Sequence, residues 1–170
     1  MNVRLRSLKR QNITSVRIKF SLFLTALLVA AADQLTKEWI RSNLATGQAI
    51  PESGLFQITH VHNTGAAFGL LSDQSSLLAM VAAIGVVLLL IYALFLHHRL
   101  PFLNNRPASL ALGLILGGTI GNLFDRLLRG YVTDFISVGI WPDFNIADSA
   151  ITIGAIILAY SLLQNVRAEE

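Results

Sequence analysis

Four stretches of this chain are long and apolar enough to cross a lipid bilayer, and this feature limits the folds open to it more than any other. A bilayer core of about 30 Å needs a helix of about 20 mostly apolar residues. Only 14% of the 170 residues are charged, against roughly a quarter in soluble domains. We therefore predict a single membrane domain over residues 1–170, with transmembrane helices at about 20–40, 77–96, 108–128 and 145–163.

The distribution of Lys and Arg predicts the orientation of these spans. Residues 1–19 carry six basic residues, the 97–107 loop carries two and the C-terminal tail carries Arg167, which places nine of the 13 on one side. Cytoplasmic loops are enriched in Lys and Arg. We expect a basic cytoplasmic leader at 1–19, two cytoplasmic termini, and extracytoplasmic segments at 41–76 and 129–144. Because these charges report topology, they predict no nucleic-acid partner.

The first span has one alternative interpretation, a cleavable secretory signal. A basic leader precedes an apolar run that ends in three small residues, 30–32, as in such signals. Against this, the helical pattern continues through Gln34 to Ile40 without a turn residue. A retained first span is therefore favoured, and detection of the leader on the mature protein would exclude the signal.

The extracytoplasmic segments contain two candidate strands. Residues 55–62 and 131–138 are rich in β-branched and aromatic residues, the composition typical of strands. We expect them to form a small sheet on the outer membrane surface. The predicted fold class is a mainly α membrane protein with four transmembrane helices and a small extracytoplasmic β-sheet cradle.

Acids inside spans are costly, are normally paired and mark function. Asp33 precedes Lys37 by one turn, the favourable order for an ion pair, which favours a structural role at the end of the first span. Asp125 and Arg126 lie near the outer end of the third span, after glycines that recur every four residues from 113 to 121. Such a stripe lets a neighbouring helix approach closely. For these two residues, bracing of the helix end and a direct role in a site remain equally open.

Two further acids form a candidate pair. Asp148 opens the fourth span on the same helical face as Asn145, Ser149 and Thr152. Two residues suited to capping, followed by hydroxyls, are more typical of a site than of a helix cap alone. Alternation along the 131–138 strand places Asp134 on an apolar face, where a polar group must face it. The nearest candidate along the chain is Asp148.

Two carboxylates that meet away from water cannot comfortably both ionise, so one keeps its proton and the other acts as a base. This is the chemistry of aspartic peptidases, in which the base activates a water and the protonated acid assists the leaving amine. The chain has no Cys and no HExxH, GxSxG or Walker motif. We therefore predict no metal and no cofactor. His60 and His62 are predicted at the protein surface or at the membrane interface, and Asp73 and Asp143 in turns.

Five short segments form a recognisable set: Asp33–Lys37 (DQLTK), Asn63–Phe68 (NTGAAF), Gly117–Arg126 (GGTIGNLFDR), Val132–Phe135 (VTDF) and Phe144–Asp148 (FNIAD). In this order, and over nearly the whole chain, they resemble the bacterial lipoprotein signal peptidase family. The resemblance implies a four-span aspartic endopeptidase of the bacterial inner membrane, with its active site near the periplasmic face. It also implies removal of signal peptides from diacylglyceryl-modified prolipoproteins by cleavage before the lipidated cysteine.

The resemblance carries roles to individual residues. Asp134 and Asp148 match the catalytic pair. Partners implied are the diacylglyceryl-modified prolipoprotein, membrane lipids and globomycin-type peptide inhibitors, with the enzyme acting as a monomer. The link between the two acids is shorter than in the family, and the basic leader is longer. The residues that match supporting positions of the site are Asn122, Asp125, Arg126, Asn145, Asp33, Asn63 and Gly65.

Two other functions fit a small membrane protein with acids in its spans. A proton-coupled carrier should show alternating access and symmetric halves, whereas here the acids cluster at one membrane face and no internal repeat is visible. A purely structural adaptor leaves the acid on the apolar strand face, Asp134, without explanation. The peptidase is favoured, and the carrier is kept as the alternative.

Overall fold

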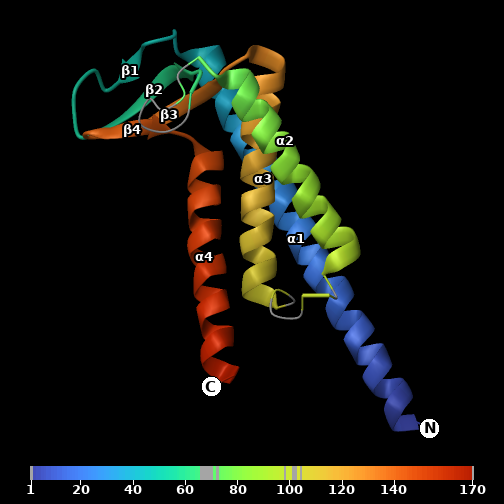
Figure 1. Cartoon of the computed structure of the whole chain (residues 1–170). Coiled ribbons are helices and arrows are strands. Elements are labelled where there is room, and N and C mark those ends of the chain that lie inside the picture. Colours follow the sequence, from blue (N-terminus) through green and yellow to red (C-terminus); the bar gives the residue numbers. More distant parts are fainter. Residues whose placement is uncertain are drawn as a thin grey trace.

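The computed structural model describes residues 2–65, 71, 73–97, 99, 100, 103 and 105–169, with side chains described only between residues 16 and 164. Ala66 to Phe68 of the second motif therefore lie outside the described residues. Figure 1 shows four long helices with a small sheet at one end and both chain termini at the other. The helices are α1 (Asn2–Asn43), α2 (Ser75–Ile91, continued by the π-helical turn η2, Tyr92–Leu96), α3 (Arg106–Arg129) and α4 (Ile146–Glu169).

Each helix contains a segment of 19 to 28 residues that is long and apolar enough to span a membrane. The predicted fold class, four membrane helices with a small sheet, is confirmed. The main difference from the predicted ranges is at the N-terminus, where α1 begins at Asn2 and includes the basic leader. Residues 2–43 contain no Gly or Pro, so nothing in the sequence interrupts the helix before or after residues 30–32.

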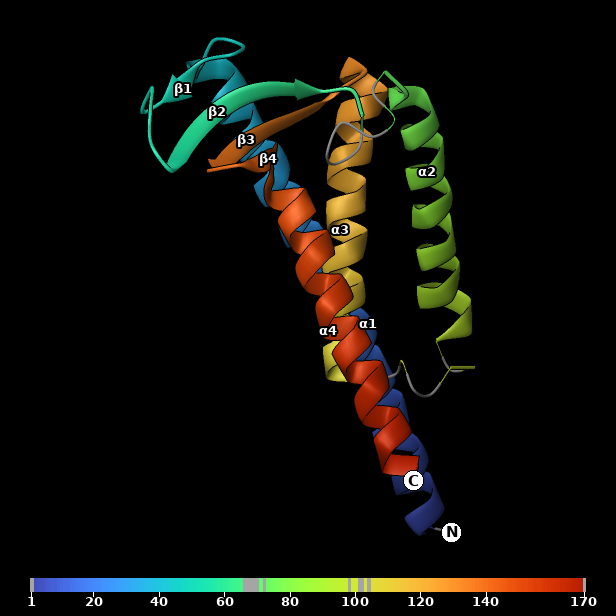
Figure 2. The same cartoon turned by 60° about the vertical axis from the view of Figure 1, so that its left-hand side comes forward.

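Helix α3 is the centre of the bundle. Figures 1 and 2 place it between α2 and α4, and it also packs along α1. A Cβ added at Gly117 would lie 2.5 Å from the Ala26 carbonyl of α1, and one added at Gly118 would lie 2.5 Å from the Ala147 carbonyl of α4. The close helix approach predicted from the glycine stripe is therefore confirmed, and glycines on two faces of α3 make it possible.

Local sequence determines both ends of α3. Asn105 caps the N-terminus by accepting a hydrogen bond from Ala108 N at 2.9 Å, and a proline occupies the first turn, where its missing N–H costs nothing. Gly130 ends the helix with φ of 77°, a left-handed conformation that glycine adopts without a steric penalty. The chain leaves this cap directly into the sheet.

The sheet is antiparallel, with the order β1 (Ala49–Ile50), β2 (Phe56–Asn63), β3 (Val132–Val138) and β4 (Trp141–Phe144). Strands β2 and β3 lie close to the two predicted strands, whereas β1 and β4 were not predicted. In the central pair, Val61 lies opposite Asp134 and Asn63 lies opposite Val132. This register brings the second and fourth motifs side by side.

Two residue predictions outside the helices are wrong. Asp143 lies in β4 and not in a turn, because the link from Asp134 to Asp148 forms a β-hairpin that turns at Gly139. Its carboxylate accepts a hydrogen bond from Thr59 Oγ1 at 3.2 Å. His60 is only 5% exposed, because its Nδ1 lies 2.9 Å from the Leu44 carbonyl just after α1. Asp73 does lie in a turn.

Candidate active site

The start of α4 is organised by two residues that cap each other. Asn145 precedes the helix, and its Oδ1 accepts a hydrogen bond from Asp148 N at 2.9 Å. In return, Asp148 Oδ2 accepts from Asn145 N at 3.2 Å. This is the reciprocal geometry of a capping box. The cap therefore uses both residues.

The same two residues have a second set of contacts, which a cap does not explain. Asn145 Nδ2 donates to Asp134 Oδ1 at 2.7 Å, and Asp148 Oδ1 accepts from Asn122 Nδ2 at 2.7 Å. Because the Asn145 oxygen is already bound by the helix N–H, its NH₂ group must face Asp134. One fully buried asparagine thus bridges the strand acid and the helix acid.

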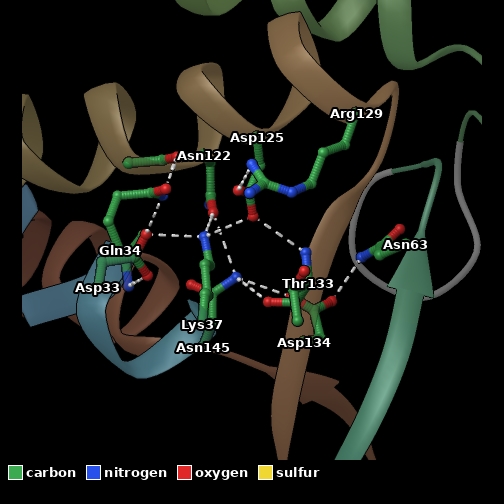
Figure 3. Close-up of polar contacts among 12 residues, drawn as sticks. Asp33, Gln34, Lys37, Asn63, Asn122, Asp125, Arg129, Thr133, Asp134 and Asn145 are labelled. Carbon is green, nitrogen blue, oxygen red and sulfur yellow. Dashed lines mark hydrogen bonds and ion pairs between the residues drawn. The ribbon is translucent and has the colours of Figure 1, made fainter. Parts of the chain in front are cut away.

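Asp134 lies in β3 with only 2% of its surface exposed. Besides the contact with Asn145, its Oδ2 accepts from Asn63 Nδ2 of β2 at 2.8 Å (Figure 3). Burial, followed by the nearby charge of Asp148, raises the pKa of Asp134 from 3.8 to about 7, against the opposing effect of the two amide hydrogen bonds. A carboxyl with this pKa is partly protonated near neutral pH.

Next to this pair lies a cluster of charged side chains, buried or partly buried, which we call the bracing cluster: Asp33, Lys37, Arg41, Asp125 and Arg129. Lys37 Nζ lies 2.7 Å from Asp33 Oδ2 and 3.3 Å from Asp125 Oδ2, and all three side chains are fully buried. Arg41 and Arg129 each lie 3.4 Å from Asp125 Oδ1. The cluster joins the end of α1 to the end of α3.

The bracing cluster also fixes the sheet and α4. Asp125 Oδ2 accepts from Thr133 N of β3 at 3.1 Å, and Arg41 donates to Thr133 Oγ1 at 3.0 Å. Asp33 Oδ1 accepts from Ala147 N at the start of α4 at 3.0 Å. Since neighbouring strand residues point to opposite faces, Thr133 faces the cluster while Asp134 faces away from it.

A cavity of about 660 Å³ opens beside the two candidate acids. Both Asp134 and Asp148 line it, as do residues of β4 and of the first turns of α4. Arg126 reaches it from α3 and donates to the Gly65 carbonyl at 3.1 Å. Its Nε is buried and has no hydrogen-bond partner among the described residues. The lining is Asn63, Gly65, Asn122, Arg126, Val132, Asp134, Trp141, Pro142, Asp143, Phe144, Asp148, Ser149, Ile151, Thr152 and Ile153.

The structure separates the nine sequence-predicted site residues into two groups. Six line the cavity, and Asn145 lies fully buried between the two acids. Asp33 and Asp125 do not line it and belong to the bracing cluster. Sequence reasoning missed Arg41, Arg129, Thr133 and the cavity residue Asp143. Helical spacing could have found two of these, because Arg41 follows Lys37 by four residues and Arg129 follows Asp125 by four.

The arrangement has the parts that acid–base chemistry on a water molecule requires. Two carboxylates face one cavity, each has both oxygens bound by amide N–H donors of the chain, and one has a pKa near neutrality. Such a pair can hold one proton and activate one water between them. In the part of the chain that the structure describes, no three His, Asp or Glu side chains are placed to hold a metal ion.

Comparisons with known proteins agree with one another. The family model described as signal peptidase (SPase) II matches residues 25–164. The chain is 53% identical over 140 residues to a lipoprotein signal peptidase of Dehalococcoides mccartyi, covering 81% of this chain and 87% of the relative. To that of Moorella thermoacetica it is 45% identical over 141 residues, covering 82% and 91%. A bacterial membrane enzyme solved by the in meso method at 2.3 Å resolution superposes with a TM-score of 0.76 at 32% identity, covering 88% of this chain and 91% of that chain.

Proposed function

This chain belongs to the signal peptidase II family and is a peptidase that removes signal peptides from prolipoproteins, and we propose that Asp134 and Asp148 are its catalytic pair, which makes it an aspartic endopeptidase. The observation that carries the proposal is that both carboxylates line one cavity and are bridged by Asn145. Asp143 lines the same cavity, but its carboxylate accepts a hydrogen bond from Thr59 Oγ1, whereas Asp134 and Asp148 are the two acids that Asn145 bridges.

The two acids have different surroundings, which supports different roles for them. Asp134 is the more buried of the two, and its pKa of about 7 keeps it largely protonated at mildly acidic pH and partly protonated at neutral pH. Asp148 is then the base. It takes a proton from a water in the cavity as the water oxygen attacks the peptide carbonyl. The Asp134 hydroxyl donates a hydrogen bond to the carbonyl oxygen, and the proton that Asp148 took from the water passes to the amine nitrogen as the C–N bond breaks.

The substrate we propose is a diacylglyceryl-modified prolipoprotein, cleaved before its lipidated cysteine. Two features of the cavity support this. One wall consists of Ile151 to Ile153 of α4, a helix that is itself a candidate membrane span, so acyl chains can reach the cavity from the bilayer. The unpartnered Arg126 Nε offers a donor for a peptide carbonyl or a lipid ester. Globomycin-type peptides would occupy the same cavity.

We also assign the orientation and the assembly state. The chain lies in the bacterial inner membrane with both termini cytoplasmic and the sheet end periplasmic. The Lys and Arg distribution supports this, since the leader, the end of η2, the start of α3 and the C-terminus lie at the end opposite the sheet (Figure 1). The monomer is proposed on the family resemblance.

The test uses purified protein and a diacylglyceryl-modified prolipoprotein, with cleavage followed by the change in substrate mass. Asp134→Asn and Asp148→Asn should each abolish cleavage, while Glu52→Gln, an acid-to-amide change at an exposed position outside the cavity, should not. Near wild-type cleavage by either Asp variant would refute the pair. Equal cleavage of the unmodified precursor would refute recognition of the lipid.

A further inference from the structure

The Asn122 side chain has neighbours that distinguish its two ends. Its Nδ2 donates to Asp148 Oδ1 at 2.7 Å. Its Oδ1 accepts from Lys37 Nζ at 2.8 Å and from Asn145 Nδ2 at 3.2 Å. An amide that turned over would present its oxygen to Asp148 and its NH₂ group to the lysine. The direction of this amide therefore decides whether Asp148 receives a hydrogen-bond donor.

Lys37 fixes this direction from the oxygen end of the amide, where the Asn145 NH₂ group also donates. An ammonium carries three N–H donors and no acceptor, so only the oxygen end of Asn122 can face it. All three donors have acceptors, on Asp33, Asn122 and Asp125. The Lys37 side chain is fully buried and is not among the described residues that line the cavity. It therefore has no route to a substrate except through its neighbours.

Lys37 influences the same acid along a second path. Its partner Asp33 uses one oxygen for the lysine and the other for Ala147 N, in the first turn of α4, at 3.0 Å. Asp148 is the next residue of that turn. Both the donor to Asp148 and the backbone that carries Asp148 are thus tied to the Lys37–Asp33 pair on α1.

We propose that Lys37 is a positioning residue of the reaction: it holds the Asn122 amide in the orientation that donates to Asp148. This inference rests on the proposed role of Asp148 as the base. The lysine acts on the chemical step and not on substrate binding, because it touches Asn122 and the bracing cluster but not the cavity. Its loss should therefore lower kcat and leave KM unchanged.

A simple replacement of Lys37 would leave Asp33 buried without a cation, and the protein could fail to fold for that reason alone. Asp125 is protected from this because Arg41 and Arg129 also contact it. The test is therefore made in an Asp33→Asn background, in which the introduced amide is neutral and retains an oxygen for Ala147 N. Two variants are compared there. Lys37→Gln keeps an N–H donor for Asn122, and Lys37→Met, of similar size, has none.

In cleavage assays on diacylglyceryl-modified prolipoprotein, Lys37→Met should lower kcat about tenfold or more relative to Asp33→Asn alone, in line with the cost of misplacing a catalytic group. KM should stay within about twofold, and Lys37→Gln should recover most of the loss. Equal kcat values for the Gln and Met variants, or a change confined to KM, would overturn the inference. The thermal unfolding of both variants is measured alongside, since a purely structural role predicts that kcat follows stability.

Should neither variant accumulate in membranes, Asn122→Asp carries the test. It retains an oxygen for Lys37 but turns a second oxygen toward Asp148, so the inference requires a large loss of kcat, and near wild-type cleavage would overturn it. Failure here is distinguishable from failure of the catalytic pair. If Asp134→Asn and Asp148→Asn are inactive while the Lys37 variants behave alike, only the positioning role is refuted.

Discussion

Asn145 performs two tasks with the two ends of one amide, and the tasks can be separated by substitution. Its Oδ1 caps α4 through Asp148 N at 2.9 Å, and its Nδ2 donates to Asp134 Oδ1 at 2.7 Å. Asn145→Ser keeps a good capping oxygen, because Ser and Asn are similarly favoured at this position. The shorter side chain has no NH₂ group for Asp134. Asn145→Ala removes both functions.

The structure sets the expected magnitudes. A hydrogen bond between neutral groups, the case for a protonated Asp134, contributes about 0.5–1.5 kcal/mol, and each 1.36 kcal/mol corresponds to about a tenfold change in rate. Both variants should therefore lose roughly two- to tenfold in kcat. Loss of an N-cap costs about 1 kcal/mol of stability, so the Ala variant alone should show that additional loss.

The assay pairs cleavage of diacylglyceryl-modified prolipoprotein with thermal unfolding of the same preparations. The expected pattern is similar kcat for the Ser and Ala variants and lower stability for Ala. Wild-type kcat in Asn145→Ser would refute the support of Asp134 by this amide. Equal stability of the Ser and Ala variants would refute the capping role.

Three further predictions concern pH, helix packing and metals. The pKa of Asp134 is about 7 in the folded chain, against an ordinary value of 3.8. The folded state therefore binds this proton more tightly than the unfolded state, and the protein loses stability as pH rises between those two values. Unfolding followed from pH 4 to 8 should show this loss in the wild type and not in Asp134→Asn. Gly117→Ala should destabilise the bundle by about 1–3 kcal/mol, because its Cβ would lie 2.5 Å from the Ala26 carbonyl. The control Gly85→Ala, whose Cβ would have nothing within 4 Å, should be neutral or stabilising. Equal stabilities of the two variants would contradict the packing argument. Chelators should leave cleavage unchanged, because two carboxylates supply the acid and the base, and inhibition reversed by added metal would contradict this.

Local patterns were sufficient for the helices. Hydropathy and length are properties of consecutive residues, so the four spans could be predicted within a few residues except at the N-terminus of α1. The strands were harder. Strands β2 and β3 carry β-branched and aromatic residues, but β1 is two residues long and β4 contains Pro142. Edge strands of this kind form because a neighbour is available for pairing, which is information from distant parts of the chain.

The candidate acids could be nominated from sequence because an acid on an apolar face is locally conspicuous. Asp134 and Asp148 were chosen in this way. Asp143 was misassigned because Asp beside Pro is typical of turns, and only its pairing beside β3 places it in the cavity wall. Arg41 was missed because its acceptors, Asp125 and Thr133, lie 84 and 92 residues away.

The sequence by itself determined that this chain spans a membrane, which four segments do so, and which acids are too costly to be there without a purpose. Each of these follows from the free energy of placing a residue in an apolar medium, which depends mainly on the residue and its immediate neighbours. The tertiary structure alone decided which groups meet. Asp33 reaches Ala147 across 114 residues, and Lys37 reaches Asn122 across 85. Contacts of this kind set the direction of an amide, because hydrogen bonds require particular atoms at particular distances. They therefore also decide which of the two carboxylates acts as the acid and which as the base.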